Sequence, residues 1–490
     1  MTQTAELIAD HSNIYPFKTR PYAHQAKAWM MSKEKDEFAL FMEMGTGKTK
    51  VAIDSIAYLY DSGRINSVLI VAPKGVYMNW VLKEIPTHLP DHVRYVIASW
   101  HAAPKKAEQE ALDHVMSQSD DLRILVMNVE AFSTDRGTKF ADLFMTCGGR
   151  VAMVVDESTT IKNPGAQRTK NVIKIGMKAK YKRILTGEPV TRSPLDLYSQ
   201  CQFLNPHLLG FSSYYTFRNR YAIMVDIKAG NRSFKKIVGF RQLDELTGLL
   251  QRFSYRVKKA DCLDLPDKIY QYRYVELSKE QKQIYKQLSD SAIASLQGKA
   301  VTVDNVLTEI LRLHQITCGH FKSDDGTIVE VPNNRLNELM DVLDEADDKV
   351  IIWATYVQDI KRIETELAKT YGPESVVSYY GATNTDDRSD AVKRFQEDPS
   401  VRFFVGNPST GGYGITLTAA TMVVYYSNSY NLEHRIQSED RAHRIGQTKS
   451  VNYVDLCTQG TIDEKIIKAL RAKKNIAATV LGEDIASWLS

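Results

Sequence analysis

Short, continuously apolar runs separated by longer amphipathic stretches are the feature of this sequence that most constrains its fold. Apolarity that is continuous rather than alternating predicts strands buried on both faces, which occur in parallel sheets covered by helices. Regular alternation of such strands with helices predicts an α/β fold. The runs are Phe38–Met42, Val68–Ala72, Ile124–Met127, Val151–Val155 and Arg183–Leu185, then Val350–Ala354, Ser375–Tyr379, Phe403–Val405, Met422–Tyr426 and Val451–Leu456. Because they form two sets, we expect two tandem lobes, each a parallel sheet flanked by helices, with helical insertions.

A polar, helix-favouring region from Ser193 to Asp347 separates the two sets of runs. Within it, the basic stretch Arg252–Lys259 precedes Leu263–Pro266, whose proline disfavours helix at the residue before it. We place the boundary between the lobes there. The expected domains are an N-terminal lobe with a helical protrusion, residues 1–257, and a C-terminal lobe with a helical insertion and C-terminal helices, residues 258–490.

Composition and charge limit the partners of the chain only weakly. The 490 residues carry a net charge of +4, which permits a polyanionic partner without requiring one. The five cysteines are scattered without a C-x-x-C pair, as is typical of free thiols in a reducing cytoplasm. The sequence does not open with a secretory signal, and no apolar run is long enough to cross a bilayer. We therefore expect a cytoplasmic protein that does not bind membranes.

Residues 38–49, FALFMEMGTGKT, indicate a strand that runs into a glycine turn and then a helix. Glycines in such a turn let backbone N–H groups surround phosphate oxygens at the positive end of the helix. Lys48 would reach the β- and γ-phosphates, and the Thr49 hydroxyl would ligate Mg²⁺. A strict P-loop has glycine where Met42 stands, so an ordinary strand–helix turn is the alternative. The residues expected to bind nucleotide here are Met44, Gly45, Thr46, Gly47, Lys48 and Thr49.

A second apolar run ends in the adjacent carboxylates Asp156 and Glu157. Ligands of α/β proteins bind at this edge of the sheet, beyond the carboxyl ends of the strands. Asp156 could hold the magnesium ion, while Glu157 could orient and deprotonate the attacking water. Two acidic residues after a strand are also common at the start of a solvated loop. Their combination with an upstream P-loop favours ATP hydrolysis.

Phosphoryl transfer also needs positive charge near the transition state. Arg441 and Arg444 are three residues apart, which would place them on one face of a helix. A surface helix with charge pairs is the alternative. Because these arginines belong to the second lobe, they could complete the ATP site of the first lobe only when the lobes close.

The chain resembles the Swi/Snf-type branch of helicase superfamily two, the ATPase motors of chromatin remodellers and DNA-repair translocases, from about Arg20 to about Ile467. Arg20–Gln25 resembles the family's adenine-reading segment, which implies that Gln25 contacts the base. The further matches are residues 69–74 with Asn79, Trp80 and Glu84 (motif Ia), 156–163 (the acidic box with its Lys-Asn tail), 183–189 (motif III), 203–206, 258–266, 380–388, 409–417 (motif V), 440–447 (motif VI) and 460–465.

The resemblance implies two RecA-like lobes that use ATP and Mg²⁺ to move along double-stranded or branched DNA, as a monomer. It also implies that Gly414 and Gln437 contact the nucleotide. The residues it assigns to DNA contacts are Lys74, Lys162, Asn163, Thr383, Ser409, Thr410 and Gly411.

Four residues depart from the family pattern, namely Ser158, Thr159, Glu188 and Thr416. Two alternatives to a duplex translocase stay open, and Ser158, Thr159 and Thr416 favour the second of them. One is a helicase that separates DNA or RNA strands. The other is a DNA-binding protein switched by nucleotide, with weak ATPase activity.

The segment from Leu311 to His320 contains three residues of metal-ligand type, His314, Cys318 and His320. Zinc normally takes four ligands, and no fourth lies nearby in the sequence. We therefore expect these side chains to serve packing.

Overall fold

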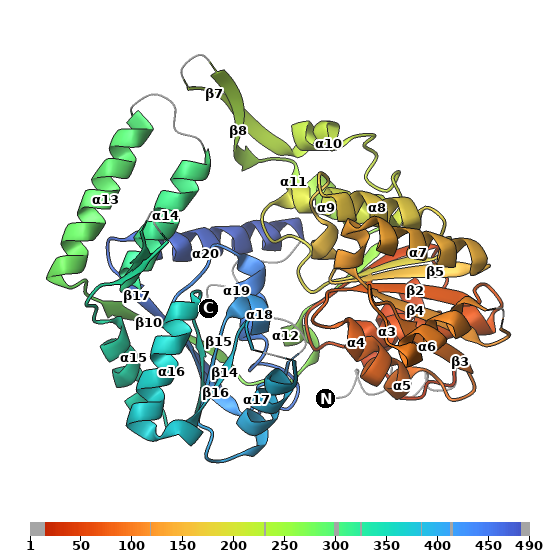
Figure 1. Ribbon diagram of the computed structural model, residues 1–490. Coiled ribbons are helices and arrows are strands. Elements are labelled where there is room, and N and C mark those ends of the chain that lie inside the picture. Colours follow the sequence, from red (N-terminus) through yellow and green to blue (C-terminus); the bar gives the residue numbers. More distant parts are fainter. Residues whose placement is uncertain are drawn as a thin grey trace. The chain divides into compact units, whose positions relative to one another are not determined.

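The computed structural model describes residues 15–117, 119–229, 232–297, 303–323, 326–383, 385–411 and 415–481 (Figure 1). The chain divides into two compact units. Unit 1 comprises the described residues within Met1–Ile223, Gly239–Asp264 and Asn475–Ser490, and unit 2 those within Met224–Val238 and Leu265–Lys474. We expected the second lobe to begin at residue 258. Residues 258–264 and 475–481 group with unit 1 instead.

Unit 1 is built on a seven-stranded parallel sheet of order β3-β4-β2-β5-β6-β1-β9. The strands are β1 Glu37–Met42, β2 Ser67–Ala72, β3 Tyr95–Ser99, β4 Leu122–Asn128, β5 Val151–Asp156, β6 Lys182–Leu185 and β9 Ser254–Val257. The five apolar runs of the first half all form strands, as predicted. The two strands that were not predicted, β3 and β9, are the edges of the sheet. Both are only partly buried. Ser254 and Arg256 interrupt β9 with polar side chains, whereas Tyr95–Ala98 of β3 is a continuous apolar run that was not among the predicted strands.

Helices cover both faces of this sheet, because successive strand residues point to opposite sides. In β2, Leu69 and Val71 belong to one hydrophobic core, and Val68 and Ile70 to the other. The helices of unit 1 are α2 Ala23–Ser32, α3 Lys48–Asp61, α4 Tyr77–Asn79, α5 Ile85–His88, α6 Lys106–Met116, α7 Asp135–Cys147, α8 Gln167–Gly176, α9 Leu197–Leu204, α10 Tyr214–Tyr221, α11 Leu243–Leu250 and α12 Lys259–Cys262. Short turns of helix are the π-helical η1 Trp80–Glu84 and the 3-10 helices η2 Val129–Ser133, η3 Ser158–Ile161 and η4 Pro194–Asp196.

Unit 2 contains a six-stranded parallel sheet of order β10-β17-β16-β13-β15-β14. Its strands are β10 Lys268–Val275, β13 Lys349–Trp353, β14 Val376–Tyr379, β15 Phe403–Gly406, β16 Ala420–Tyr425 and β17 Val451–Thr458, with a separate pair, β11 His320–Lys322 and β12 Ile328–Glu330. The helices are α13 Lys279–Gln297, α14 Val303–Thr317, α15 Arg335–Asp344, α16 Val357–Tyr371, η5 Pro373–Ser375, α17 Thr385–Glu397, α18 Pro408–Gly411, α19 Leu432–Glu439 and α20 Ile462–Val480. The two units, each an α/β fold with a parallel sheet, confirm the predicted fold class.

The region between the two sets of runs is less helical than predicted. Besides α9 to α15, residues 193–347 contain β7 Ala222–Ala229 and β8 Arg232–Phe240, which pair as a two-stranded sheet. The two strands lie within residues 1–257, expected to form the N-terminal lobe, but Met224–Val238 group with unit 2. Ile223, Val225 and Ile227 recur at every second position, and this period of two with β-branched side chains favours a strand.

Within the described residues, no cluster of three or more His, Cys, Asp or Glu side chains could hold a metal ion. His314 instead lies with its Nδ1 2.8 Å from the Tyr356 hydroxyl, and Cys318 is fully buried, in line with a packing role. The described helices include none with both the length and the apolarity that crossing a bilayer requires.

A buried ion pair ties the helices of unit 2 to its sheet. Arg335, at the start of α15, donates to Asp463 at the start of α20 and to the carbonyl oxygens of Thr317 and Tyr426. Both charged side chains are at least 95% buried. Removing one partner would leave the other charge unpaired in the interior, which is far costlier than losing an exposed pair.

We expect Arg335→Ala to destabilise unit 2 by about 3–5 kcal/mol. The control is Arg273→Ala, which removes a partly exposed partner of Glu345 and should cost less than about 1 kcal/mol. Thermal unfolding monitored by calorimetry measures both. Equal shifts for the two variants would contradict this role of Arg335.

Candidate nucleotide-binding site

The P-loop of unit 1 depends on two glycines with left-handed backbone conformations. Gly45 has φ 82° and Gly47 has φ 88°, and α3 begins at Lys48 directly after the turn. The turn is closed by Thr46, whose backbone N and Oγ1 both donate to the carbonyl oxygen of Glu43, at 3.2 and 2.8 Å. The turn therefore has the backbone geometry that a phosphate cradle requires.

The first turn of α2 lies directly on this glycine turn. Gln25 is buried, and its Nε2 donates to the Thr46 carbonyl oxygen at 3.1 Å. A Cβ atom on Gly47 would lie 2.1 Å from the same Nε2, so only glycine fits there. His24 Nε2 is 2.8 Å from the same carbonyl oxygen, and burial lowers the pKa of its ring. The Tyr22 ring, 56% exposed, stacks on that of His24 with 5.9 Å between centroids. The aromatic pair was not singled out from the sequence.

The two predicted carboxylates lie next to the P-loop lysine. Lys48 Nζ is 3.2 Å from Glu157 Oε1, and both side chains are about nine-tenths buried. Asp156 ends β5, and its Oδ1 accepts the backbone N–H of Glu157 at 2.9 Å. Glu157 itself has φ 45°, which costs a non-glycine residue roughly 1–3 kcal/mol and is typical of functional sites. Unit 1 thus brings together Lys48, Asp156 and Glu157, three side chains suited to binding and hydrolysing a magnesium-bound nucleotide.

Trp80 bonds to Asp156, the residue predicted to hold Mg²⁺, a contact that the sequence did not predict. Its Nε1 donates to Asp156 Oδ2 at 2.9 Å, and its ring is buried. Trp80 begins the π-helical turn η1, and such turns occur frequently at functional sites. Hydrogen bonds to a ligating carboxylate fix the direction of its lone pairs.

One departure from the family pattern, Glu188, takes part in an ionic network beneath the P-loop. Arg256, on the edge strand β9, lies with Nη2 3.3 Å from Glu188 Oε1 and 3.4 Å from Glu43 Oε1. Arg256 also donates to the Gly187 carbonyl oxygen. Glu43 in turn accepts the backbone N–H of Lys259 at 2.9 Å. Since Glu43 opens the glycine turn, the network holds the start of the P-loop against the sheet.

A second departure from the family pattern, Ser158, packs inside unit 1. Ser158 is fully buried, and its Oγ donates to Gln200 Oε1 at 2.7 Å. Of the predicted DNA contacts of this unit, Lys162 donates to Thr191 Oγ1 at 2.7 Å, whereas Lys74 and Asn163 are exposed in turns after β2 and η3. Exposure leaves these two side chains accessible to a ligand.

In unit 2 the two predicted arginines converge on one backbone oxygen. Arg441 Nη1 and Arg444 Nη1 donate to the Ile415 carbonyl oxygen at 2.9 and 3.3 Å. The expectation of a shared helical face is wrong, because α19 ends at Glu439 and both arginines lie in the turns that follow. Gln437 is buried in the last turn of α19, and Gly414 lies outside the described residues.

Helix α19 is held by charged side chains from β17 and β10. Arg435 binds Asp455 of β17 through Nη2 at 3.0 Å and Glu439 through Nε at 2.7 Å. Lys268 of β10 is 3.3 Å from Glu439. Although burial raises the pKa of Glu439, these two cations hold it well below its ordinary value. The helix that precedes Arg441 and Arg444 is therefore fixed to the sheet.

The remaining predicted DNA contacts of unit 2 lie in loops after strands. Ser409, Thr410 and Gly411 form the short helix α18 after β15, and Ser409 N donates to Asn407 Oδ1 at 2.8 Å. Thr383 N donates to the Tyr380 carbonyl oxygen at 3.1 Å in the turn after β14. Both segments follow the carboxyl ends of parallel strands, where α/β proteins bind ligands.

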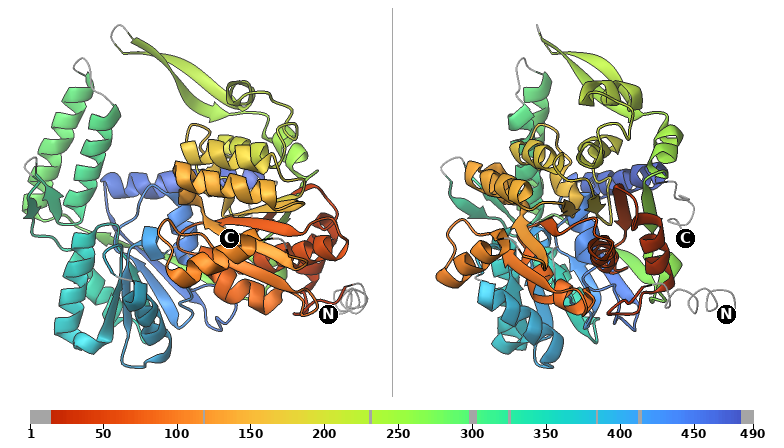
Figure 2. Two further views of the ribbon diagram at one scale, coloured as in Figure 1. Left: turned by 45° about the vertical axis from the view of Figure 1, so that its right-hand side comes forward. Right: turned by 90° about the vertical axis from the view of Figure 1, so that its right-hand side faces the viewer.

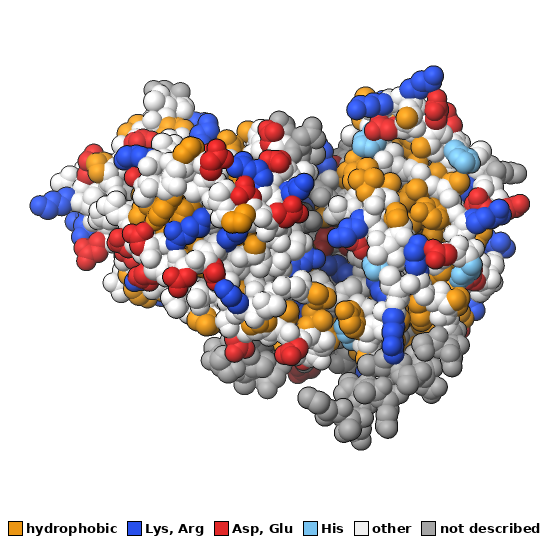
Figure 3. Space-filling view, turned by 90° about the horizontal axis from the view of Figure 1, so that it is seen from below, with side chains coloured by type: hydrophobic (Ala, Val, Ile, Leu, Met, Phe, Trp, Pro, Cys, Tyr) orange, Lys and Arg blue, Asp and Glu red, His pale blue; other side chains and the backbone are white. Residues whose placement is uncertain are grey.

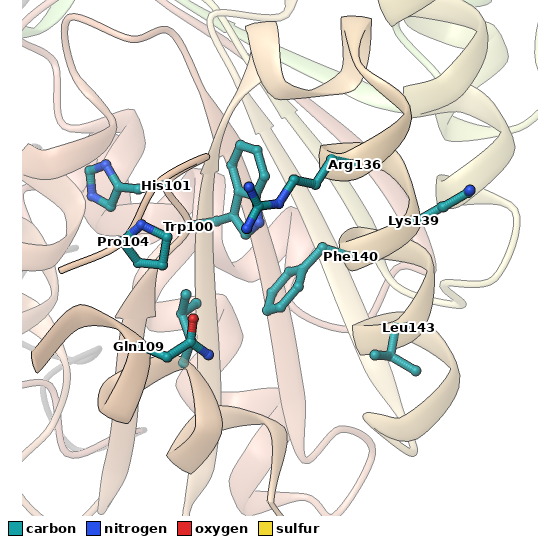
Figure 4. A pocket seen from close by; sticks show the side chains of 9 residues that line it. Trp100, His101, Pro104, Gln109, Arg136, Lys139, Phe140 and Leu143 are labelled. Atoms are coloured by element: carbon teal, nitrogen blue, oxygen red, sulfur yellow. The ribbon is translucent and has the colours of Figure 1, made fainter. Parts of the chain in front are cut away.

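A hollow of about 290 Å³ lies elsewhere in unit 1, at the edge strand β3 (Figure 4). Aromatic and cationic side chains line it, among them Trp100, His101, Arg136, Lys139 and Phe140. None of the residues assigned to nucleotide binding contributes to it.

Comparisons with known proteins identify the family of the chain. Residues 22–322 match the SNF2-related domain, and residues 333–446 match the Helicase conserved C-terminal domain. The helicase/translocase YwqA of Bacillus subtilis is 28% identical over 99% of this chain and 51% of its own length. The DNA helicase CHR12 of Arabidopsis thaliana is 28% identical over 94% of this chain and 42% of its own. The chain thus spans about half the length of these relatives or less. The solved SWI2/SNF2 ATPase core of Sulfolobus solfataricus in complex with dsDNA is 26% identical, covering 97% of this chain and 96% of that one, with a TM-score of 0.42.

The role of the hydrogen bond from Trp80 to Asp156 can be tested by substitution. Trp80→Phe keeps an aromatic ring in the core but removes the Nε1–H donor together with the smaller ring of the indole; the control variant makes the same change in volume. We expect ATP turnover to fall roughly 10- to 100-fold and the Mg²⁺ concentration for half-maximal hydrolysis to rise, because an outer hydrogen bond to a metal ligand is lost.

Trp29→Phe is the matched control, since Trp29 is equally buried and its Nε1 bonds to no partner in the described structure. It should leave the Mg²⁺ dependence unchanged. If Trp80→Phe shows the wild-type Mg²⁺ dependence, Trp80 does not position Asp156.

Proposed function

We propose that this chain, which belongs to the SNF2-related family, is an ATPase stimulated by double-stranded DNA. The protein tracks the duplex without necessarily separating its strands. The observation that carries this proposal is the buried contact of Lys48 with Glu157, beside Asp156, at a glycine turn. The names of the Bacillus and Arabidopsis relatives, a helicase/translocase and a DNA helicase, support movement on DNA.

Each of the candidate site residues in unit 1 has a distinct role in the proposed hydrolysis of ATP to ADP and phosphate. Lys48 and the backbone of residues 44–47 bind the phosphates, and Gln25 binds the adenine. Thr49 and Asp156 would hold Mg²⁺, which supplies positive charge at the β- and γ-phosphates. Glu157 orients the attacking water and accepts its proton. Since Lys48 and Glu157 are paired, phosphate oxygens would compete with Glu157 for Lys48 and leave the carboxylate available to water.

Unit 2 is proposed to complete this site. Arg441 and Arg444 would stabilise the charge of the transferring phosphoryl group, with Gln437 and Gly414 near the nucleotide. The shared contact of both arginines with the Ile415 carbonyl oxygen supports a joint role, because it gathers two guanidinium groups at one point. Completion by a second unit would couple ATP hydrolysis to relative motion of the units, as movement along DNA requires.

The proposed partner is double-stranded or branched DNA, bound by a monomer. Exposed Lys74 and Asn163 in unit 1, and the loops of Thr383 and of Ser409–Gly411 in unit 2, are the proposed contacts. Lys162 joins them if DNA displaces its bond to Thr191. Contacts of this kind bind phosphates and do not read sequence.

The test is the ATPase rate against matched duplex DNA, single-stranded DNA, forked DNA and RNA. We expect uninterrupted duplex to stimulate hydrolysis most. Lys48→Ala is the control, and it should abolish hydrolysis under every condition because it removes the charge at the phosphates. A rate that duplex DNA does not change, in protein that binds ATP, would contradict the proposal. Unwinding of a tailed duplex without a preference for uninterrupted duplex would favour a strand-separating helicase.

A further inference from the structure

We propose that the β7–β8 ribbon is an accessory binding element for duplex DNA, acting through Lys235 and Lys236. This inference rests on the proposed function for its choice of duplex DNA as the ligand. It deepens that function by adding a contact outside the motifs shared with the family. The ribbon is drawn as two long strands in Figures 1 and 2.

The charge of this segment is unlike that of the rest of the chain. Residues 222–240 contain four lysines or arginines and a single acidic residue, Asp226, a net charge of +3 within a chain whose net charge is +4. On the face drawn in Figure 3, cationic and acidic side chains are interspersed. A local excess of positive charge of this size attracts a polyanion.

The ribbon exposes its side chains on both faces. Lys235 and Lys236 are exposed, and none of the described side chains between residues 223 and 238 is buried. Aliphatic residues are exposed as well, with 43% of Val225 and 55% of Val238 accessible. A two-stranded sheet without a covering layer is only marginally stable by itself, so a bound partner would stabilise it.

The base of the ribbon is held firmly by unit 1. Tyr221, which precedes β7, is fully buried, and its hydroxyl donates to Glu245 Oε1 at 2.9 Å. Arg241, which follows β8, donates through its backbone N to the Tyr221 carbonyl oxygen at 2.9 Å and through Nε to that of Arg220 at 3.1 Å. Binding would therefore cost less conformational entropy than ordering a free loop.

Protection of the open strand edges is a simpler explanation for charged side chains, but it does not require one sign of charge. Here four of the five charges of residues 222–240 are positive. The major groove of duplex DNA admits a two-stranded ribbon, with lysines reaching phosphates on its walls. The geometry and charge of the β7–β8 ribbon fit that ligand.

The test is duplex binding by the full chain carrying Lys235→Glu and Lys236→Glu, measured by fluorescence anisotropy between about 50 and 200 mM salt. Losing two phosphate contacts should weaken binding roughly ten-fold or more at about 0.1 M salt and make the slope of log K against log salt shallower by about 1.8. Circular dichroism verifies folding of each variant.

The matched control is Lys105→Glu with Lys106→Glu, an exposed lysine pair of unit 1 outside the ribbon, which changes the net charge equally. It should keep the wild-type slope. If the ribbon variant binds duplex with the wild-type affinity and slope, or if both variants weaken binding alike, the inference is wrong. Because the assay measures binding directly, it decides this point even if duplex DNA fails to stimulate the ATPase.

Discussion

The contact between Lys48 and Glu157 is the interaction on which the functional interpretation of this structure depends. The two residues are far apart in sequence and meet because β1 and β5, with β6 between them, run parallel in one sheet. Parallel strands end at the same edge, so a glycine turn after one strand and a carboxylate pair after another must face each other. The meeting of Lys48 with Glu157 thus follows from the sheet topology.

Around that contact lies a second layer of side chains that hold its members in place. Trp80 bonds to Asp156, Arg256 links Glu43 to Glu188, and Gln25 lies against the glycine turn. These partners come from separate segments of unit 1. Side chains held in this way would keep their positions as charge develops on a reacting phosphate. Such preorganisation favours electrostatic catalysis.

The sequence was most informative where local pattern and tertiary environment agree. The central strands are buried on both faces, and each showed a continuous apolar run. The edge strands β3 and β9 are only partly buried. β9 has no such run, whereas Tyr95–Ala98 of β3 is one that was not predicted as a strand. The spacing of Arg441 and Arg444 indicated a helix, but α19 ends before them and the arginines reach Ile415 from turns. The bonds of Trp80 and Arg256 join distant segments, so no local pattern could have predicted them.

The central claim is that the guanidinium groups of unit 2 complete the nucleotide site of unit 1. It can be tested by energy transfer between a dye on the exposed native Cys147 of unit 1 and a dye on Lys369→Cys of unit 2, with the partly exposed Cys262 replaced by serine. With duplex DNA and ADP–aluminium fluoride, a mimic of the transition state, we predict a new narrow distance population that Arg444→Ala does not form. The same distance distribution with and without the ligands, or the same response in Arg444→Ala, would contradict a composite site.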